Sequence, residues 1–199
     1  KLRRDKPLPL QFFRKVAIGQ LVYEGDEEAV RKMGERIGRA VQTFEVGELA
    51  ILLHKPIPSK SLGTFLEAVE AGIESRYQIQ VRSYGRPVWK VPVYVYELYQ
   101  YIRSREGEPI VVTDPKGDYI THVKEELAQL FRRDRVNVLI GSREGIPTGV
   151  FRLASLVVDL VPEVTIATDF VVPSLAVALV SALEEAGALP RYVGKRRKH

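Results

Sequence analysis

Short, largely apolar segments alternate with an amphipathic helix in the second half of the chain. Residues 110–113 and 136–140 read as strands, and residues 122–132 between them have the spacing of a helix with one apolar face. Strands that are apolar on both faces are typical of a parallel sheet covered by helices. Apolar runs at 156–161 and 164–167 follow, before a last helix predicted over 174–186. The sequence therefore predicts an α/β fold with a mostly parallel sheet flanked by helices.

The first half of the chain adds similar elements. A strand is expected within 12–23 and another over 48–54, where two prolines then end the apolar run. Residues 27–44 carry apolar side chains at the three-to-four spacing of a helix with one buried face. Ser61 stands before a second amphipathic helix.

The middle of the chain is rich in tyrosine and arginine. Residues 77–82 and 87–91 are two β-prone runs on either side of a short polar turn, a pattern that predicts a hairpin. Residues 93–103 are then expected to be helical.

The length of 199 residues fits one domain over 1–199. Within it, residues 1–47 are a possible N-terminal extension and residues 190–199 a basic tail. Residues 1–15 hold six Lys or Arg against one Asp, and the tail holds five and no acid. Basic ends of this kind favour contact with nucleic-acid phosphates, although solvated tails are the alternative.

Composition excludes several kinds of site. The chain has no cysteine and only three histidines, without the spacing of metal ligands, so a cysteine nucleophile and a metal centre are not expected. No run approaches the ~20 apolar residues of a membrane span, and the basic start lacks the apolar core of a signal peptide. We therefore expect a cytoplasmic protein without a membrane contact.

Residues 141–147 form a glycine-containing loop directly after an apolar strand. In an open α/β sheet, loops at the carboxyl ends of parallel strands are where ligands bind. The loop has neither the glycine order of a dinucleotide fold nor that of an ATPase P-loop, and its glycines could simply form a tight turn. Residues 166–178 offer a second place for a ligand, because they lead through Pro173 into a helix with small side chains at its start.

Together, residues 141–147 and 173–178 resemble the paired cofactor motifs of the SPOUT class of RNA methyltransferases, over roughly residues 108–187. The resemblance implies a C-terminal trefoil knot, S-adenosylmethionine as cofactor, and a homodimer. The middle of the chain is similar to the ribosome-biogenesis branch that methylates pseudouridine at N1 in rRNA. That branch has Arg-Pro-Asp where this chain has Ile57-Pro58-Ser59.

The resemblance assigns the cofactor contacts to three segments with mostly main-chain groups. They are Gly141, Ser142, Glu144, Gly145 and Ile146 in the first, Thr165, Ile166 and Ala167 in the second, and Pro173, Ser174, Leu175 and Val177 in the third. Methyl transfer depends chiefly on positioning, so few catalytic side chains are expected. The candidates are Asp114, Arg143 and Asp169, each of which could equally be a turn residue or an exposed charge.

Cations and aromatic residues alternate between 76 and 105, a combination that suits unpaired RNA because bases stack on rings while cations meet phosphates. The candidate RNA contacts are Arg76, Arg82, Tyr84, Arg86, Trp89 and Lys90.

The sequence thus predicts an S-adenosylmethionine-dependent methyltransferase that acts on rRNA or tRNA. The alternative is a non-catalytic RNA-binding or ribosome-assembly protein that keeps the SPOUT fold. A nuclease or other hydrolase is disfavoured, because the acidic residues are not spaced as metal ligands.

Overall fold

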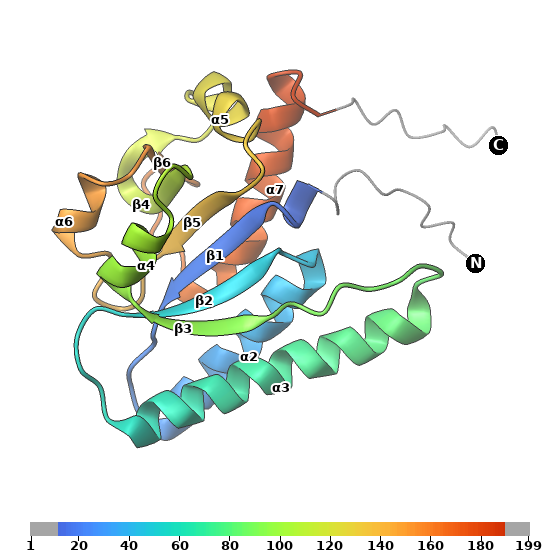
Figure 1. The fold of residues 1–199 in the computed structure, drawn as a ribbon, viewed down its shortest axis with the longest axis vertical. Coiled ribbons are helices and arrows are strands. Elements are labelled where there is room, and N and C mark those ends of the chain that lie inside the picture. Colours follow the sequence, from blue (N-terminus) through green and yellow to red (C-terminus); the bar gives the residue numbers. More distant parts are fainter. Residues whose placement is uncertain (1–11, 190–199) are drawn as a thin grey trace.

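The computed structural model describes residues 12–189, in which six strands form one parallel sheet (Figure 1). The order across the sheet is β3-β2-β1-β5-β4-β6, and every neighbouring pair is parallel. The strands are β1 (Val16–Leu21), β2 (Glu48–Leu53), β3 (Val93–Glu97), β4 (Ile110–Tyr119), β5 (Val136–Ile140) and β6 (Leu156–Asp159). The predicted α/β fold with a parallel sheet is confirmed.

Helices cover both faces of this sheet (Figure 1). The helices are α2 (Glu27–Phe44), α3 (Ser59–Ser83), α4 (Leu98–Ser104), α5 (Lys124–Leu130), α6 (Thr148–Phe151) and α7 (Thr168–Glu185). The larger hydrophobic core lies on the face covered by α2, α3, α5 and α7, and α3 packs along α2. The smaller core lies on the opposite face, under α4 and α6.

Successive side chains of each strand point to opposite faces of the sheet, so one strand contributes to both hydrophobic cores. In β5, Val138 joins the larger core and its neighbour Leu139 joins the smaller one. In β2, Ile51 and Leu52 divide in the same way. Since successive side chains of a strand point to opposite faces, a strand between two helical layers must be apolar throughout. This explains the apolar runs in the sequence.

Residues 16–44 belong to the centre of this architecture. Strand β1 lies between β2 and β5, and α2 packs against both α3 and α7. Helix α2 has the predicted bounds, and the Asp26 side chain caps its start by accepting a hydrogen bond from the Ala29 amide at 2.9 Å.

The hairpin predicted over 77–91 is wrong. Residues 59–83 form a single helix of 25 residues, and residues 84–92 contain no strand. The β-branched residues that suggested a strand, Ile79 and Val81, are 44% and 48% exposed, so they contribute little to a buried face. The helix is instead held by Gln80, whose side chain is buried and hydrogen bonded to Gln42 of α2.

Two later boundaries also differ from the prediction. Residues 93–97 form strand β3, so only residues 98–103 of the expected helix are helical, and α4 ends one residue later. The last helix begins at Thr168, which leaves 164–167 outside any strand and places Pro173 inside α7. Proline is common in the first turn of helices, and for that reason Pro173 suggested a later start than the real one.

Glycines let α2 and α3 approach closely along one line of contact. A Cβ atom at Gly38 would overlap the carbonyl oxygen of Val69, and one at Gly72 would overlap that of Glu35. Both obstacles are backbone atoms, so the helices themselves would have to separate. Gly63, also in α3, has no atom within 4 Å of such a Cβ.

We expect Gly38→Ala and Gly72→Ala each to lower the free energy of unfolding by about 2–3 kcal/mol, because overpacking forces the two backbones apart. Gly63→Ala is the matched control and should leave stability unchanged or raise it by up to about 1 kcal/mol, since alanine favours the helix. Urea unfolding followed by circular dichroism measures all three. Equal losses in all three variants would contradict the role of close helix contact.

Candidate functional site

A buried side chain of β1 holds the loop that follows β5. Gln20, fully buried at the end of β1, donates hydrogen bonds of 3.0 Å to the carbonyl oxygens of Gly141 and Leu21. The loop then closes on itself, since the Gly145 amide donates to the Ser142 carbonyl at 2.9 Å. Gly145 has a φ of 74°, a left-handed conformation that favours glycine. The loop is therefore a defined turn rather than a loose connection.

A cavity of about 190 Å³, which we call the carboxyl-edge cavity, opens beside this loop. It lies beside the irregular middle of β4 and the ends of β5 and β6, at the carboxyl edge where open α/β sheets bind ligands. Three chain segments line it: Thr113, Asp114 and Pro115; Ile140, Gly141, Ser142, Arg143 and Gly145; and Val158, Asp159, Leu160, Val164, Thr165, Ile166, Thr168 and Val171.

Apolar and polar residues both line this cavity, and two backbone amides beside it are free among the described residues. Within residues 12–189, the amides of Thr165 and Ile166 donate no hydrogen bond to another residue. The carboxylate oxygens of Asp114 and Asp159 each accept a bond from an amide two residues further on, at 2.9 and 3.1 Å. Free amides beside apolar side chains can bind a flat, heterocyclic ligand through the backbone.

The structure brings together part of the predicted cofactor set. Gly141, Ser142, Gly145, Thr165 and Ile166 all line the carboxyl-edge cavity. The remaining residues of the first two segments lie elsewhere: Glu144 points to Lys55, Ile146 is buried in the smaller core, and Ala167 caps α7.

The third predicted segment lies inside α7 and outside the cavity. Leu175 is buried in the larger core, whereas Val177 is 66% exposed. Pro173 and Ser174 are half-buried within the helix. The turn that does enter the helix, at 165–168, lines the cavity instead of residues 173 and 174.

The structure places two of the three catalytic candidates at the cavity and the third away from it. Asp114 and Arg143 both line the cavity. Asp169 is buried in the first turn of α7 and forms an ion pair of 2.9 Å with Arg36 of α2. That pair joins the two helices.

Two of the predicted RNA contacts surround a buried carboxylate. Glu45 follows α2, is fully buried, and forms an ion pair with Arg86. It also accepts hydrogen bonds from the Trp89 amide at 2.9 Å and from Arg14 at 3.4 Å. Burial alone would raise the pKa of Glu45, but these bonds and the Arg86 charge hold it below its ordinary value. The carboxylate therefore stabilises the fold above the ordinary carboxyl pKa, and this contribution is lost as the pH falls through the lowered pKa.

The other predicted RNA contacts lie along the second half of α3 and just after it. Lys90 pairs with Glu74 at 2.5 Å, and Arg86 lies over the ring of Tyr84. Arg82 is exposed, and Arg76 has a buried Nε without a hydrogen-bond partner among residues 12–189. Residues that precede β3 lie at the amino edge of the parallel sheet, opposite the carboxyl-edge cavity (Figure 1).

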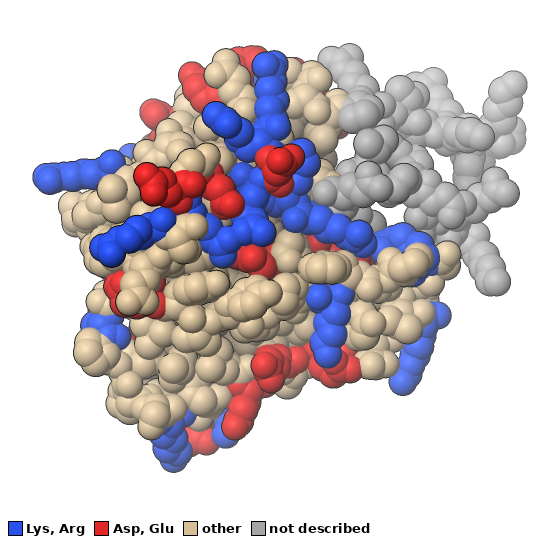
Figure 2. Space-filling view, viewed as in Figure 1, with Lys and Arg blue, Asp and Glu red and all other residues tan. Residues whose placement is uncertain are grey.

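The face shown in Figure 2 carries mixed charge. Lys and Arg side chains gather over the region of β1, β5 and the turn after α4, with acidic groups among them, and uncharged surface extends over β3. In that region Arg135 lies between Glu48 and Glu108, at 4.0 and 3.8 Å. Part of the positive charge on this face is therefore already paired within the protein.

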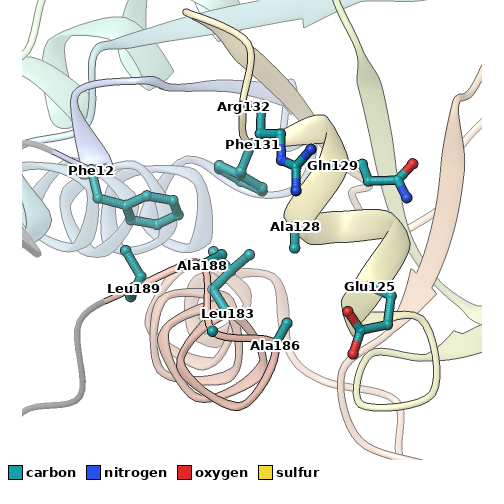
Figure 3. A pocket seen from close by; sticks show the side chains of 11 residues that line it. Phe12, Glu125, Ala128, Gln129, Phe131, Arg132, Leu183, Ala186, Ala188 and Leu189 are labelled. Atoms are coloured by element: carbon teal, nitrogen blue, oxygen red, sulfur yellow. The ribbon is translucent and has the colours of Figure 1, made fainter.

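A separate apolar cavity of about 330 Å³ lies between α5, the end of α7 and Phe12 (Figure 3). The rings of Phe12 and Phe131 and the side chain of Leu183 form its walls, with Glu125 and Arg132 at its border. It contains none of the predicted site residues.

In the part of the chain that the structure describes, no group of three or more His, Asp or Glu side chains is arranged to hold a metal ion. Among the helices of residues 12–189, none is long and apolar enough to cross a membrane.

Comparison with protein families decides the class. Residues 10–199 match the model of the AF2226-like SPOUT RNA methylase fused to THUMP. The chain belongs to this family. The SPOUT class expected from the two loop motifs is therefore confirmed, and its pseudouridine-N1 branch stays a prediction.

A curated protein is similar to this SPOUT chain over most of the chain's length. The chain is 41% identical over 182 residues to an uncharacterized protein of Methanocaldococcus jannaschii, a match that covers 90% of this chain and 51% of that protein. The chain thus spans about half the length of the curated relative that it matches.

Solved structures share the SPOUT fold at low sequence identity. An AdoMet-bound rRNA methyltransferase from Sinorhizobium meliloti is 13% identical, with a TM-score of 0.54, over 89% of this chain and 60% of that one. A SpoU methyltransferase from Streptomyces viridochromogenes is 12% identical, with a TM-score of 0.54, over 88% and 61%. A probable methyltransferase from Bordetella pertussis is 13% identical, with a TM-score of 0.54, over 88% and 98%.

The contacts of Arg86 lead to a prediction. Arg86→Gln should lower the free energy of unfolding by about 2–3 kcal/mol, because it removes a charged partner from the buried Glu45. Arg82→Gln is the matched control and should leave stability unchanged, since Arg82 is exposed. Urea unfolding at neutral pH measures both. If Arg86→Gln is as stable as the control, Arg86 is not a structural residue.

Proposed function

We propose that this protein transfers a methyl group from S-adenosylmethionine to RNA, either rRNA or tRNA. The observation that carries the proposal is the carboxyl-edge cavity, which a glycine loop and the turn into α7 line together. Membership of the SPOUT RNA methylase family supports the same function.

The residues of the cavity fit S-adenosylmethionine. The free amides of Thr165 and Ile166 are donors for an adenine ring, and Val158, Leu160 and Val171 are apolar walls for it. The main chain at Gly145 leaves room for a close approach, because no atom of the described residues beyond its chain neighbours lies within 4 Å of the place where a Cβ would be. S-adenosylmethionine, when bound, supplies an electrophilic methyl group, and the chain's own task is to hold donor and acceptor in line.

Charged groups at the cavity suit an RNA acceptor. Arg143 lines the cavity, is exposed, and has no ion-pair partner among residues 12–189, so its guanidinium can meet a phosphate. Asp114, across the same cavity, is a candidate to receive a proton from the acceptor. The basic segments 1–11 and 190–199 lie outside the described residues, and their contact with RNA stays a prediction. So do the trefoil knot and the cytoplasmic location.

Cofactor binding tests the proposal. Isothermal titration with S-adenosylmethionine should give saturable binding to the wild-type protein and at least about tenfold weaker binding to Thr165→Trp, whose indole would fill the cavity. Thr165→Ser is the matched control and should bind like the wild type. Circular dichroism checks that all three are folded.

Absence of binding by the wild-type protein would overturn the methyltransferase proposal. Binding without transfer of labelled methyl groups to total rRNA or tRNA would favour the non-catalytic RNA-binding alternative.

We further propose a homodimer formed through the outer face of α7. Phe170 and Val177, seven residues apart and therefore on one side of the helix, are 60% and 66% exposed. Val164, in the segment before α7, is 49% exposed. Neighbouring exposed apolar side chains are typical of a surface that another protein covers.

Sedimentation equilibrium tests the dimer. The wild type should sediment as a dimer, and the double variant Phe170→Glu with Val177→Glu as a monomer, because two charges would be buried in the interface. The control Ile79→Glu with Val81→Glu alters two other exposed apolar residues, in α3, and should remain dimeric. A monomeric wild type, or a dimeric α7 variant, would contradict this interface.

A further inference from the structure

A second cavity, of about 500 Å³, lies against the same glycine loop. We call it the β1–β2 cavity, because its other walls follow these two strands. It is lined by Val22, Glu24 and Gly25 after β1, by His54 after β2, and by Ser142, Arg143, Glu144 and Gly145. Three of the loop residues, Ser142, Arg143 and Gly145, line the carboxyl-edge cavity as well. Ligands in the two cavities would therefore contact the same short stretch of main chain.

The polar groups around the β1–β2 cavity are held in place by one lysine. Lys55 Nζ forms ion pairs with Glu24 at 2.9 Å and with Glu144 at 3.0 Å. The hydrogen bond from Lys55 and its charge lower the pKa of Glu144, and the hydrogen bonds that Lys55 donates to Glu24 and Glu144 raise the pKa of Lys55. Glu144 therefore stays ionised at neutral pH, as an acceptor at the cavity wall.

His54 has unused hydrogen-bonding capacity at this wall. Its Nε2 lies 3.6 Å from a carboxylate oxygen of Glu144, which is beyond a good hydrogen bond. Its Nδ1 is buried and has no hydrogen-bond partner among residues 12–189. A buried ring nitrogen without a partner is unfavourable in a purely structural role. A ligand that reorients the His54 ring would supply hydrogen-bond partners for its nitrogens.

Positive charge without a partner completes the wall. Arg143 reaches across the cavity, since its Nη1 is 3.6 Å from the position of a Cβ built at Gly25. The cavity thus combines a free guanidinium, two fixed carboxylates, an imidazole and the apolar side chain of Val22. A ribonucleotide presents the complementary groups, namely a phosphate, hydroxyl and base N–H donors, and an apolar base face.

We propose that the β1–β2 cavity binds one unpaired ribonucleotide of the RNA substrate. Arg143 contacts its phosphate, Glu144 and His54 bond its donors, and Val22 lies against its base. This placement rests on the proposed function, because it brings the nucleotide beside the cofactor loop. The nearness of the two cavities is what methyl transfer requires, since donor and acceptor must touch.

Two variants separate the cavities. Gly25→Phe places a ring in the β1–β2 cavity, and a Cβ at Gly25 meets no atom closer than 3.5 Å, so the backbone accepts the change. Gly25 does not line the carboxyl-edge cavity, and Thr165 does not line the β1–β2 cavity. Gly25→Phe should therefore bind S-adenosylmethionine within about threefold of the wild type, whereas Thr165→Trp loses at least about tenfold.

Nucleotide binding is measured on the full chain without cofactor, by NMR of the imidazole groups. The chain has three histidines, and His54→Gln identifies the His54 resonance. Addition of the four ribonucleoside 5′-monophosphates in turn should shift this resonance with at least one of them and leave that of His122 in place. Thr165→Trp should retain the shift and Gly25→Phe should lose it.

Three outcomes would overturn the placement: no shift of His54 with any of the four nucleotides, a shift that persists in Gly25→Phe, or an equal shift with inorganic phosphate alone, which would indicate a plain anion site. Failure of the proposed function is seen separately, as the absence of S-adenosylmethionine binding by the wild type.

Discussion

The parallel direction of all six strands is the constraint on which the rest of the structure depends. Because every strand runs the same way, the loops that follow β1, β2, β4, β5 and β6 all reach one edge of the sheet. Residues 141–145 lie at the middle of that edge, after a strand flanked by β1 and β4. The loop therefore has neighbours on both sides, and a cavity opens on each. Gln20 fixes it in this position by bonding the carbonyl oxygen of Gly141.

The amino edge of the sheet is built for stability instead. Tyr101 donates a hydrogen bond to Asn137 at 2.9 Å, and Asn137 in turn donates to Glu108 at 2.9 Å. Beside them Arg105 pairs with the largely buried Glu48 and lies over the Tyr101 ring. Burial raises the pKa of Tyr101, so its hydroxyl remains a donor. A buried network of this kind is unfavourable to break, so it stabilises this edge of the sheet.

The sequence predicted those elements that local signals determine, and it missed those that tertiary contacts determine. The helix over 27–44 and the strand over 136–140 were predicted with their correct bounds, because a capping side chain and a short apolar run are local signals. The hairpin prediction was wrong because it rested on the intrinsic β preference of the residues. The helix that forms there is stabilised by a hydrogen bond between Gln80 and Gln42, which are far apart in the sequence. The start of α7 failed for a related reason: Pro173 is a local signal, but burial of Asp169 against Arg36 favours an earlier first turn.

The site was harder to predict than the fold, since its lining residues come from three segments that lie apart in the sequence. Glycines after an apolar strand indicated the loop at 141–145, and family resemblance indicated the turn at 165–166. No sequence signal near His54 indicated a site, because the carboxylate that lies near it, Glu144, is on another loop. Glu144 and its ion-pair partner Lys55 are 89 positions apart in the sequence. Once a sheet is known to be all parallel, however, each loop that follows a buried strand belongs to the same edge. Charged and aromatic residues directly after such strands are then site candidates together, however far apart they lie in the sequence.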